Sequence, residues 1–170
     1  MGLDITFHER LTKVDVKLNE DGEPIGHETD WAFYDSHTNV FINPDFPTRA
    51  DGMQGGFHKS EGETEDLRIG YSSYSQWRSE LALAALGAPA MQVWEGEITE
   101  GPFVELINFS DCEGTIGPRT SAKLAKDFAD WEDKIEGMVS GGTRDYFMEK
   151  FRKFKAGFEL AKDSGAATFH

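Results

Sequence analysis

The segment PFVELINFSDCEGTIGPRTSAKLAKDFADW, residues 102–131, contains the change of pattern on which the predicted fold depends. An apolar start is followed by a polar loop and then by an amphipathic stretch. Phe103, Leu106 and Ile107 have the i, i+3, i+4 spacing of one helical turn, and a strand is the competing interpretation. Pro118 lacks a backbone N–H that the first turn of a helix does not need, so a long helix is predicted to begin there.

Two long helices are predicted in the C-terminal third of the chain. The first has an apolar stripe with helical spacing, which consists of Leu124, Phe128, Trp131 and Ile135. Residues 140–142, Ser-Gly-Gly, interrupt the pattern, and Thr143 is the expected cap of the second helix. Its apolar face, which suits the core or a dimer seam, consists of Phe147, Phe151, Phe154 and Phe158. Gly165 is predicted to end this helix, and residues 167–170 to form a short terminal strand.

The N-terminal part of the chain has the pattern of short strands. Residues 3–7 alternate apolar and polar side chains with the period of a half-buried strand, and residues 14–18 repeat this pattern. Residues 21–22, Asp-Gly, favour a turn because glycine adopts positive φ readily. Residues 31–34 and 39–42 are further strand candidates. The connections look too short for helical crossovers, so these strands are expected to be antiparallel.

The middle of the chain combines a long loop with one strand. Residues 43–66 contain prolines, glycines and charges without a sustained apolar period, which predicts a lid or a mobile loop. Residues 67–71 are then predicted to form a short strand.

One further helix follows this strand. Ser72 or Ser73 is its expected cap, and Gly87 followed by Pro89 is its expected end. Residues 91–98 are ambiguous, with a weak strand pattern.

Strands in the first half and helices in the second predict an α+β fold for a single domain, residues 1–170. We expect a small antiparallel sheet, built from the N-terminal half. It would pack against a C-terminal helical hairpin plus one further helix.

Composition restricts the classes of partner. The chain has 17 basic and 31 acidic residues, a net charge of −14, which disfavours direct binding of DNA or RNA. A single cysteine, Cys112, excludes an internal disulfide. The start of the chain shows no signal-peptide pattern, and its longest mostly apolar run, residues 81–91, is too short to span a bilayer. We therefore expect a cytoplasmic protein with no membrane contact. The sequence is compatible with a monomer and with a homo-oligomer.

The polar loop is the first candidate site. Small polar side chains just before a helix start, with a nearby guanidinium, offer hydrogen bonds and positive charge to a phosphate or carboxylate. The residues concerned are Asn108, Ser110, Asp111, Cys112, Glu113, Thr115 and Arg119. The alternative is a rigid turn in which Ser110 and Asp111 bond only to local backbone.

A second cluster lies on the predicted middle helix. Tyr71, Tyr74, Trp77 and Arg78 combine aromatic rings with a guanidinium, a pairing that stacks a base and holds a phosphate. Helical spacing also suits Tyr74 and Trp77 to the core, which is the competing interpretation. His170 joins the candidate binding residues if the terminal strand docks.

Catalytic chemistry has little support in the sequence, and no catalytic residue, metal ligand or cofactor is assigned. Cys112 as a nucleophile needs a base, and the sequence does not pair it with His8, His37 or His170. Asp111 and Glu113 suit a metal or an acid–base pair, but the five histidines are scattered. His27-Glu28-Thr29 is a lone H-x-T motif, where a phosphoesterase needs two that face each other.

Four segments resemble a family of small uncharacterised proteins encoded by phages and prophages: MGLDI, GYSSYSQWR, INFSDCEGTIGP and the C-terminal FH. The resemblance implies the host cytosol and an accessory role, such as interference with antiviral defence. We expect a binding protein that sequesters a nucleotide-like signal or inhibits a host defence factor. The alternatives are a metal-dependent hydrolase using Asp111 and Glu113, and an acidic mimic of nucleic acid that inhibits a host protein.

Overall fold

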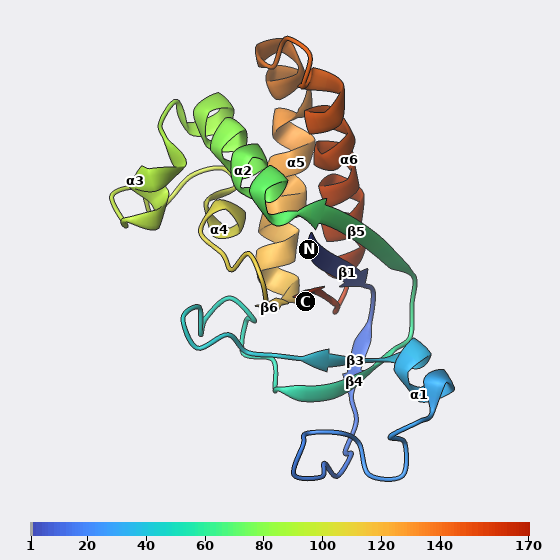
Figure 1. Cartoon of the computed structure of the whole chain (residues 1–170). Coiled ribbons are helices and arrows are strands. Elements are labelled where there is room, and N and C mark those ends of the chain that lie inside the picture. Colours follow the sequence, from blue (N-terminus) through green and yellow to red (C-terminus); the bar gives the residue numbers. More distant parts are fainter. Residues whose placement is uncertain (1) are drawn as a thin grey trace.

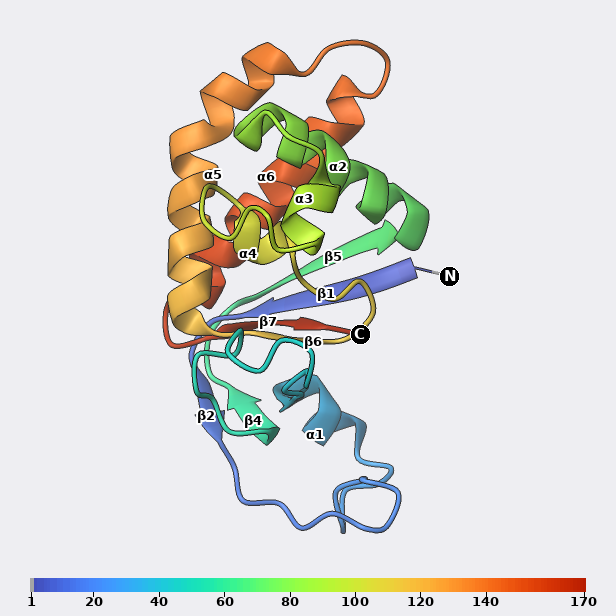
Figure 2. The ribbon, with the colours of Figure 1, turned by 90° about the vertical axis from the view of Figure 1, so that its left-hand side faces the viewer.

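The computed structural model describes residues 2–170, so Met1 of the MGLDI segment lies outside the described part. Helices cover one face of a four-stranded sheet, and a three-stranded sheet with a short helix lies on the other side (Figures 1 and 2). This arrangement confirms the predicted α+β class. None of the helices in residues 2–170 is long and apolar enough to cross a membrane.

The four-stranded sheet is antiparallel throughout, with the order β5-β1-β7-β6. Its strands are β1 (Gly2–His8), β5 (Thr64–Gly70), β7 (Ala166–Phe169) and β6 (Gly114–Ile116). The predicted first strand and the predicted terminal strand are therefore confirmed. The expectation that the sheet comes from the N-terminal half is wrong for β6 and β7. Both come from the C-terminal half of the chain. β7 pairs with β1 and β6 pairs with β7, and the local sequence pattern does not encode such long-range pairing.

The smaller sheet has the order β2-β4-β3 and contains most of the differences from prediction. Its strands are β2 (Leu11–Lys13), β4 (Gly56–Ser60) and β3 (His37–Val40). The loop predicted for residues 43–66 is wrong for β4 and for the start of β5. The strand predicted for residues 39–42 begins and ends earlier.

Two further strand predictions near the N-terminus are wrong. Residues 31–34 belong to a helix, α1 (Trp31–Ser36), because the Asp30 side chain accepts a hydrogen bond from the Phe33 N–H at 3.2 Å and caps it. In residues 14–18 only Leu18 forms a bridge, to Pro24, since the small sheet ends before this segment.

The helices are α2 (Tyr71–Leu86), α3 (Ala90–Trp94), α4 (Val104–Ile107), α5 (Pro118–Met138) and α6 (Arg144–Ala161). The predicted hairpin of two C-terminal helices is confirmed. The single helical turn predicted before the polar loop is α4, and the ambiguous segment after Pro89 forms α3.

The predicted helix ends are correct at some positions and wrong at others. Gly87 has a φ of 64° and ends α2 in the left-handed region, and Pro118 opens α5, both as predicted. Gly70, instead of Ser72 or Ser73, is the N-cap of α2, and no side chain caps it. Thr143 occupies the N-cap position of α6, but its hydroxyl makes no capping bond. Packing stabilises these helices without local caps.

Aromatic rings fill the space between the helices and the sheet. Phe158 meets Phe7 of β1 edge-on at 5.1 Å, and Phe154 stacks on Trp77 of α2 at 4.7 Å. All four phenylalanines of the α6 stripe are buried within the single chain. The stripe is therefore core.

A glycine allows α6 to approach the sheet closely. A Cβ at Gly157 would lie 2.4 Å from the ring of Phe7, so this ring packs against the helix backbone itself. The distance between the helix layer and β1 thus depends on a position with no side chain.

Gly157→Ala is expected to lower the free energy of unfolding by about 1–3 kcal/mol, because the added methyl overlaps Phe7. The loss outweighs the gain of about 1 kcal/mol that alanine brings to a helix. Urea denaturation measures the free energy of unfolding of the variant and the wild type. The matched control is Gly137→Ala in α5, where nothing lies within 4 Å of the new Cβ and stability should rise. A Gly157→Ala protein as stable as the wild type would contradict the close approach.

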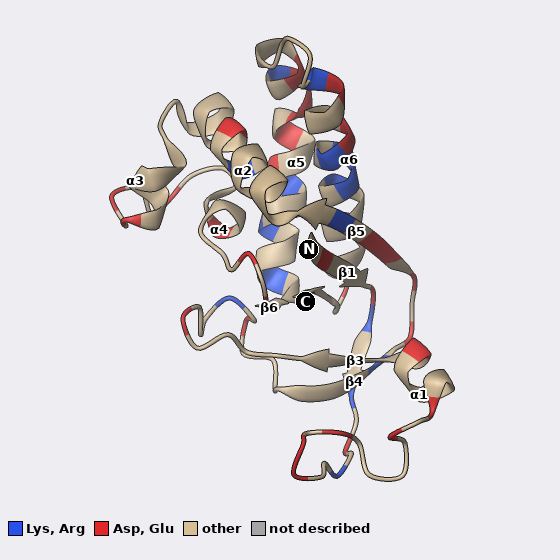
Figure 3. Ribbon diagram, in the orientation of Figure 1, with Lys and Arg blue, Asp and Glu red and all other residues tan. Residues whose placement is uncertain are grey.

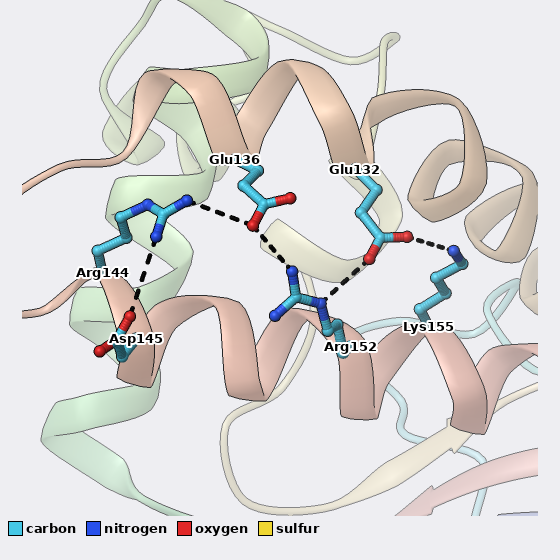
Figure 4. A network of polar contacts seen from close by, with 6 residues as sticks. All are labelled: Glu132, Glu136, Arg144, Asp145, Arg152 and Lys155. Carbon is cyan, nitrogen blue, oxygen red and sulfur yellow. Dashed lines mark hydrogen bonds and ion pairs between the residues drawn. The ribbon is translucent and has the colours of Figure 1, made fainter.

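Ion pairs join α5 to α6 along their exposed side (Figure 4). Glu132 accepts hydrogen bonds from Lys155 and from Arg152, the latter at 3.2 Å. Glu136 accepts from Arg152 at 3.0 Å and from Arg144 at 3.3 Å. The hydrogen bond from Lys155 holds the pKa of Glu132 below its ordinary value of 4.5, although burial acts in the opposite direction.

Glu132→Gln is expected to lower stability at pH 7 by about 1 kcal/mol at most, since the pairs are partly exposed. A depressed carboxyl pKa stabilises the fold only where the carboxylate is ionised, so this stabilisation is lost as the pH falls through the folded-state pKa. Urea denaturation should therefore show that the difference in stability between Glu132→Gln and the wild type shrinks between pH 7 and pH 3. Glu100→Gln, at an exposed site outside the network, is the control. An equal difference in stability at both pH values would contradict a stabilising role for the ionised Glu132 carboxylate.

Candidate functional site: a cavity beside Arg78

Part of the polar loop bonds internally. The Ser110 hydroxyl accepts from the backbone N–H groups of Cys112 and Glu113, at 3.2 and 3.1 Å. Thr115 lies in β6, is buried, and accepts from the Phe41 N–H at 3.2 Å. For Ser110 the structure matches the alternative of a rigid turn.

The start of α5 is not free to bind an anion, so that expectation is wrong. Asp51 accepts from the Thr120 N–H at 2.7 Å and from the Thr120 hydroxyl at 2.9 Å. Arg119 is exposed and donates to the Asp51 carbonyl at 3.3 Å. Thus a carboxylate from a distant loop already occupies the positive end of the helix.

A cavity of about 510 Å³ nevertheless lies beside the polar loop. It is bounded by Phe41 and residues 43–46, by Arg78 of α2, by Trp94 at the end of α3, and by residues 108–113. We call it the Arg78 cavity. Asn43 joins two of its walls, because its side-chain amide donates to the Glu113 carbonyl at 2.9 Å.

Arg78 is the buried polar group of this cavity, with only 5% of its surface exposed. Its guanidinium donates to the carbonyls of Ile107 and Phe109, at 3.2 and 2.7 Å, and lies over the Tyr74 ring at 4.3 Å. Its Nε has no hydrogen-bond partner. Within residues 2–170 no carboxylate forms an ion pair with it, so the buried charge is held by carbonyl dipoles and aromatic faces.

Trp94 and the loop residues 41–46 were not predicted as site residues. Trp94 lies 5.6 Å from the Arg78 guanidinium, is 38% exposed, and donates from its indole N–H to the Ile107 carbonyl at 2.9 Å. The only sequence signal for it was a tryptophan in an ambiguous segment. Residues 41–46 reach the site through tertiary folding alone.

The structure brings half of the predicted binding residues together. Those that line the Arg78 cavity are Arg78, Asn108, Ser110, Asp111, Cys112 and Glu113. Those that it places elsewhere are Tyr71, Tyr74, Trp77, Thr115, Arg119 and His170. Tyr74 and Trp77 are core residues, the competing interpretation, and burial raises the pKa of the Tyr74 phenol.

Asp111, Cys112 and Glu113 are exposed at the rim of the cavity. The described residues contain no group of three or more His, Cys, Asp and Glu side chains suited to a metal ion. None of the histidines lines this cavity, so Cys112 has no imidazole base beside it; its sulfur lies 3.4 Å from the Ser110 hydroxyl.

The chain matches no protein-family model, and it has no significant match among the curated proteins or the solved structures.

Asp51→Ala is expected to lower the free energy of unfolding by about 1–2 kcal/mol through loss of the cap, and further because Asp51 has a φ of 57°, which alanine adopts poorly. Asp51→Asn keeps a capping oxygen and tolerates this φ, so its loss should be smaller. Chemical denaturation compares the two, with exposed Asp15→Ala as the control. Equal stability of Asp51→Ala and the wild type would show that α5 does not depend on this cap.

Proposed function

We propose that this protein binds a small molecule, and that the Arg78 cavity receives the base of a nucleotide-like ligand. The observation that supports this is the buried guanidinium of Arg78, which lines a cavity and has an unpartnered Nε. Burying a charge without a carboxylate partner is unfavourable. An acceptor on a ligand in the cavity would add a partner to the guanidinium.

The cavity suits a planar base better than a phosphate. Its volume falls in the usual range for small-molecule sites, and Trp94 offers a partly exposed ring for stacking. Asp45, Asp111 and Glu113 place carboxylates on its lining, which would repel phosphate groups and accept hydrogen bonds from base amino groups. Nucleobase edges carry both donors and acceptors, so a base can meet Arg78 and a carboxylate together.

The resemblance to phage-encoded proteins supports a role for such binding. A protein that holds a nucleotide-like signal in the host cytosol would keep it from a defence factor, and this requires no catalysis. Direct inhibition of a host defence protein is the other form of the proposal.

The two alternatives have less support. Asp111 and Glu113 are exposed at the cavity rim without a third ligand side chain, which gives a metal-dependent hydrolase no centre within residues 2–170. A mimic of nucleic acid needs rows of unpaired carboxylates. Acidic residues of α5 and α6 are instead interspersed with basic ones (Figure 3), and Glu132 and Glu136 are paired with arginine and lysine.

Nucleosides and nucleotides, including cyclic dinucleotides, are expected to bind the purified protein and to change its tryptophan fluorescence. Trp94→Leu should weaken binding about tenfold or more, because base stacking contributes about 1–3 kcal/mol. Arg78→Lys, which keeps the charge but not the planar fork, should weaken it by a similar factor. Isothermal titration calorimetry measures both.

Trp31→Leu is the matched control, since Trp31 is 80% exposed and lies on α1, outside the cavity. Circular dichroism establishes that each variant is folded. The proposal fails if no base-containing compound binds, or if Trp94→Leu and Trp31→Leu bind equally well.

A further inference from the structure

The tripeptide Thr-Phe-His occurs twice, and the fold places the two copies side by side. Residues 6–8 lie in β1, and residues 168–170 comprise the end of β7 and the final histidine. The strands are antiparallel with Thr6 opposite Thr168. Since alternate residues of a strand share a face, both phenylalanines enter the core, and two threonines with two histidines share the opposite face.

The side chains of the two copies contact each other across the strands. The Thr6 hydroxyl lies 3.4 Å from His170 Nε2, and the Thr168 hydroxyl lies 3.4 Å from His8 Nε2. Thr168 also donates its hydroxyl proton to the Thr6 carbonyl at 3.2 Å, so its oxygen is left to accept from His8. With Nε2 as the donor, Nδ1 of His8 is the bare nitrogen, and it has no hydrogen-bond partner.

These residues line a cleft of about 350 Å³ between the four-stranded sheet and the smaller sheet. We call it the histidine cleft. Its polar lining includes His8, His170 and Thr6 from one side, Asp66 from β5, and Asp35 and His37 from α1 and β3. His8 is only 7% exposed, so an imidazole with an unpartnered nitrogen lies almost buried in the cleft wall.

A second hollow of about 730 Å³ adjoins the cleft and shares Thr6, Asp66 and His170 with it. Its lining includes Arg68, Lys150 and Lys153, and Figure 3 shows basic residues on α6 and at the end of β5. The same lining contains the carboxylates of Asp4 and Asp66.

The charged side chains around the two hollows balance, and the main-chain carboxylate of His170, which accepts from the Asp4 N–H at 2.9 Å, adds one negative charge. The cations are Arg68, Lys150 and Lys153, and the anions are Asp4, Asp35 and Asp66. Asp4 is paired with Arg68 at 2.6 Å. A proton on the His8 imidazole would add positive charge beside a bound anion and strengthen its attraction.

We propose that the histidine cleft is a second binding site, which receives a phosphate-ester group and takes up a proton as it does so. The phosphate oxygens would accept hydrogen bonds from the imidazoles and from the Thr6 hydroxyl, with the remainder of the ligand toward Lys150 and Lys153. This site is separate from the Arg78 cavity, and His170 is its one residue that was predicted from the sequence to bind a ligand.

The electrostatics of His8 agree with proton uptake on binding. Burial, together with the nearby His170, lowers its pKa to about 4, although Asp66 acts in the opposite direction. His8 is therefore neutral near pH 7 in the free protein. An anion beside it favours the charged form and raises its pKa, so the affinity for the anion must rise as the pH falls.

Dimethyl phosphate is a suitable probe, because its charge does not change over the pH range concerned. We expect it to shift the ring signals of His8 and His170 in NMR spectra of histidine-labelled protein, saturably and with little change at His27. The association constant should rise by about tenfold per pH unit over the range in which one proton is taken up. Titrations at pH 5.5, 6.5 and 7.5 measure it.

His170→Gln and Lys153→Gln are the test variants, since both lie at accessible positions where substitution leaves the core intact. Each should weaken dimethyl phosphate binding at pH 5.5 several-fold, and His170→Gln should also reduce the pH dependence. His27→Gln, at a histidine outside the cleft, should bind like the wild type. Absence of any shift at His8 and His170, or an affinity that is the same at all three pH values, would overturn the proposal.

Discussion

The contact between Phe7 and the backbone of α6 at Gly157 sets the distance between the helices and the central strand of the sheet. β1 pairs with β5 on one side and with β7 on the other, so the positions of both neighbours depend on the position of β1. The phenylalanine stripe of α6 then meets rings from α2 and α5 across the same space. A buried core of large rings tolerates little displacement, which makes this one close approach a constraint on the whole helix layer.

The two faces of the four-stranded sheet have opposite chemistry. Leu3, Ile5 and Phe7 point to the helices, whereas Asp4, Thr6 and His8 point away from them. An antiparallel sheet with one solvated face has this alternation for solubility alone. Here the smaller sheet covers part of the polar face, and Thr168 and His8 are buried beneath it. Burying polar groups is unfavourable without full hydrogen bonding, and the buried Nδ1 of His8 has no hydrogen-bond partner.

The candidate sites were predictable only in part. The polar character of residues 108–113 and the guanidinium of Arg78 stand out in the sequence, and the fold brings them to one cavity. The sequence did not predict the roles of these residues, because the same hydroxyls and carboxylates can bond either to the chain or to a ligand. Ser110 and Thr115 bond to the chain. Asp51, which was not predicted as a capping residue, occupies the start of α5. Trp94 and His8 gained their surroundings from segments far away in the sequence.

By itself, the sequence determined the α+β class, the first and last strands, and the long helices, with the Gly87 end of α2 and the Pro118 start of α5. These features depend on periodicity and on backbone restrictions, which act over a few residues. The predicted end at Gly165 was wrong, because α6 ends at Ala161. Only the tertiary structure decided that β6 and β7 complete the main sheet, that residues 56–60 form a strand, and that two Thr-Phe-His segments face each other. Pairing between distant strands depends on which apolar faces are buried together, and that is a property of the whole chain.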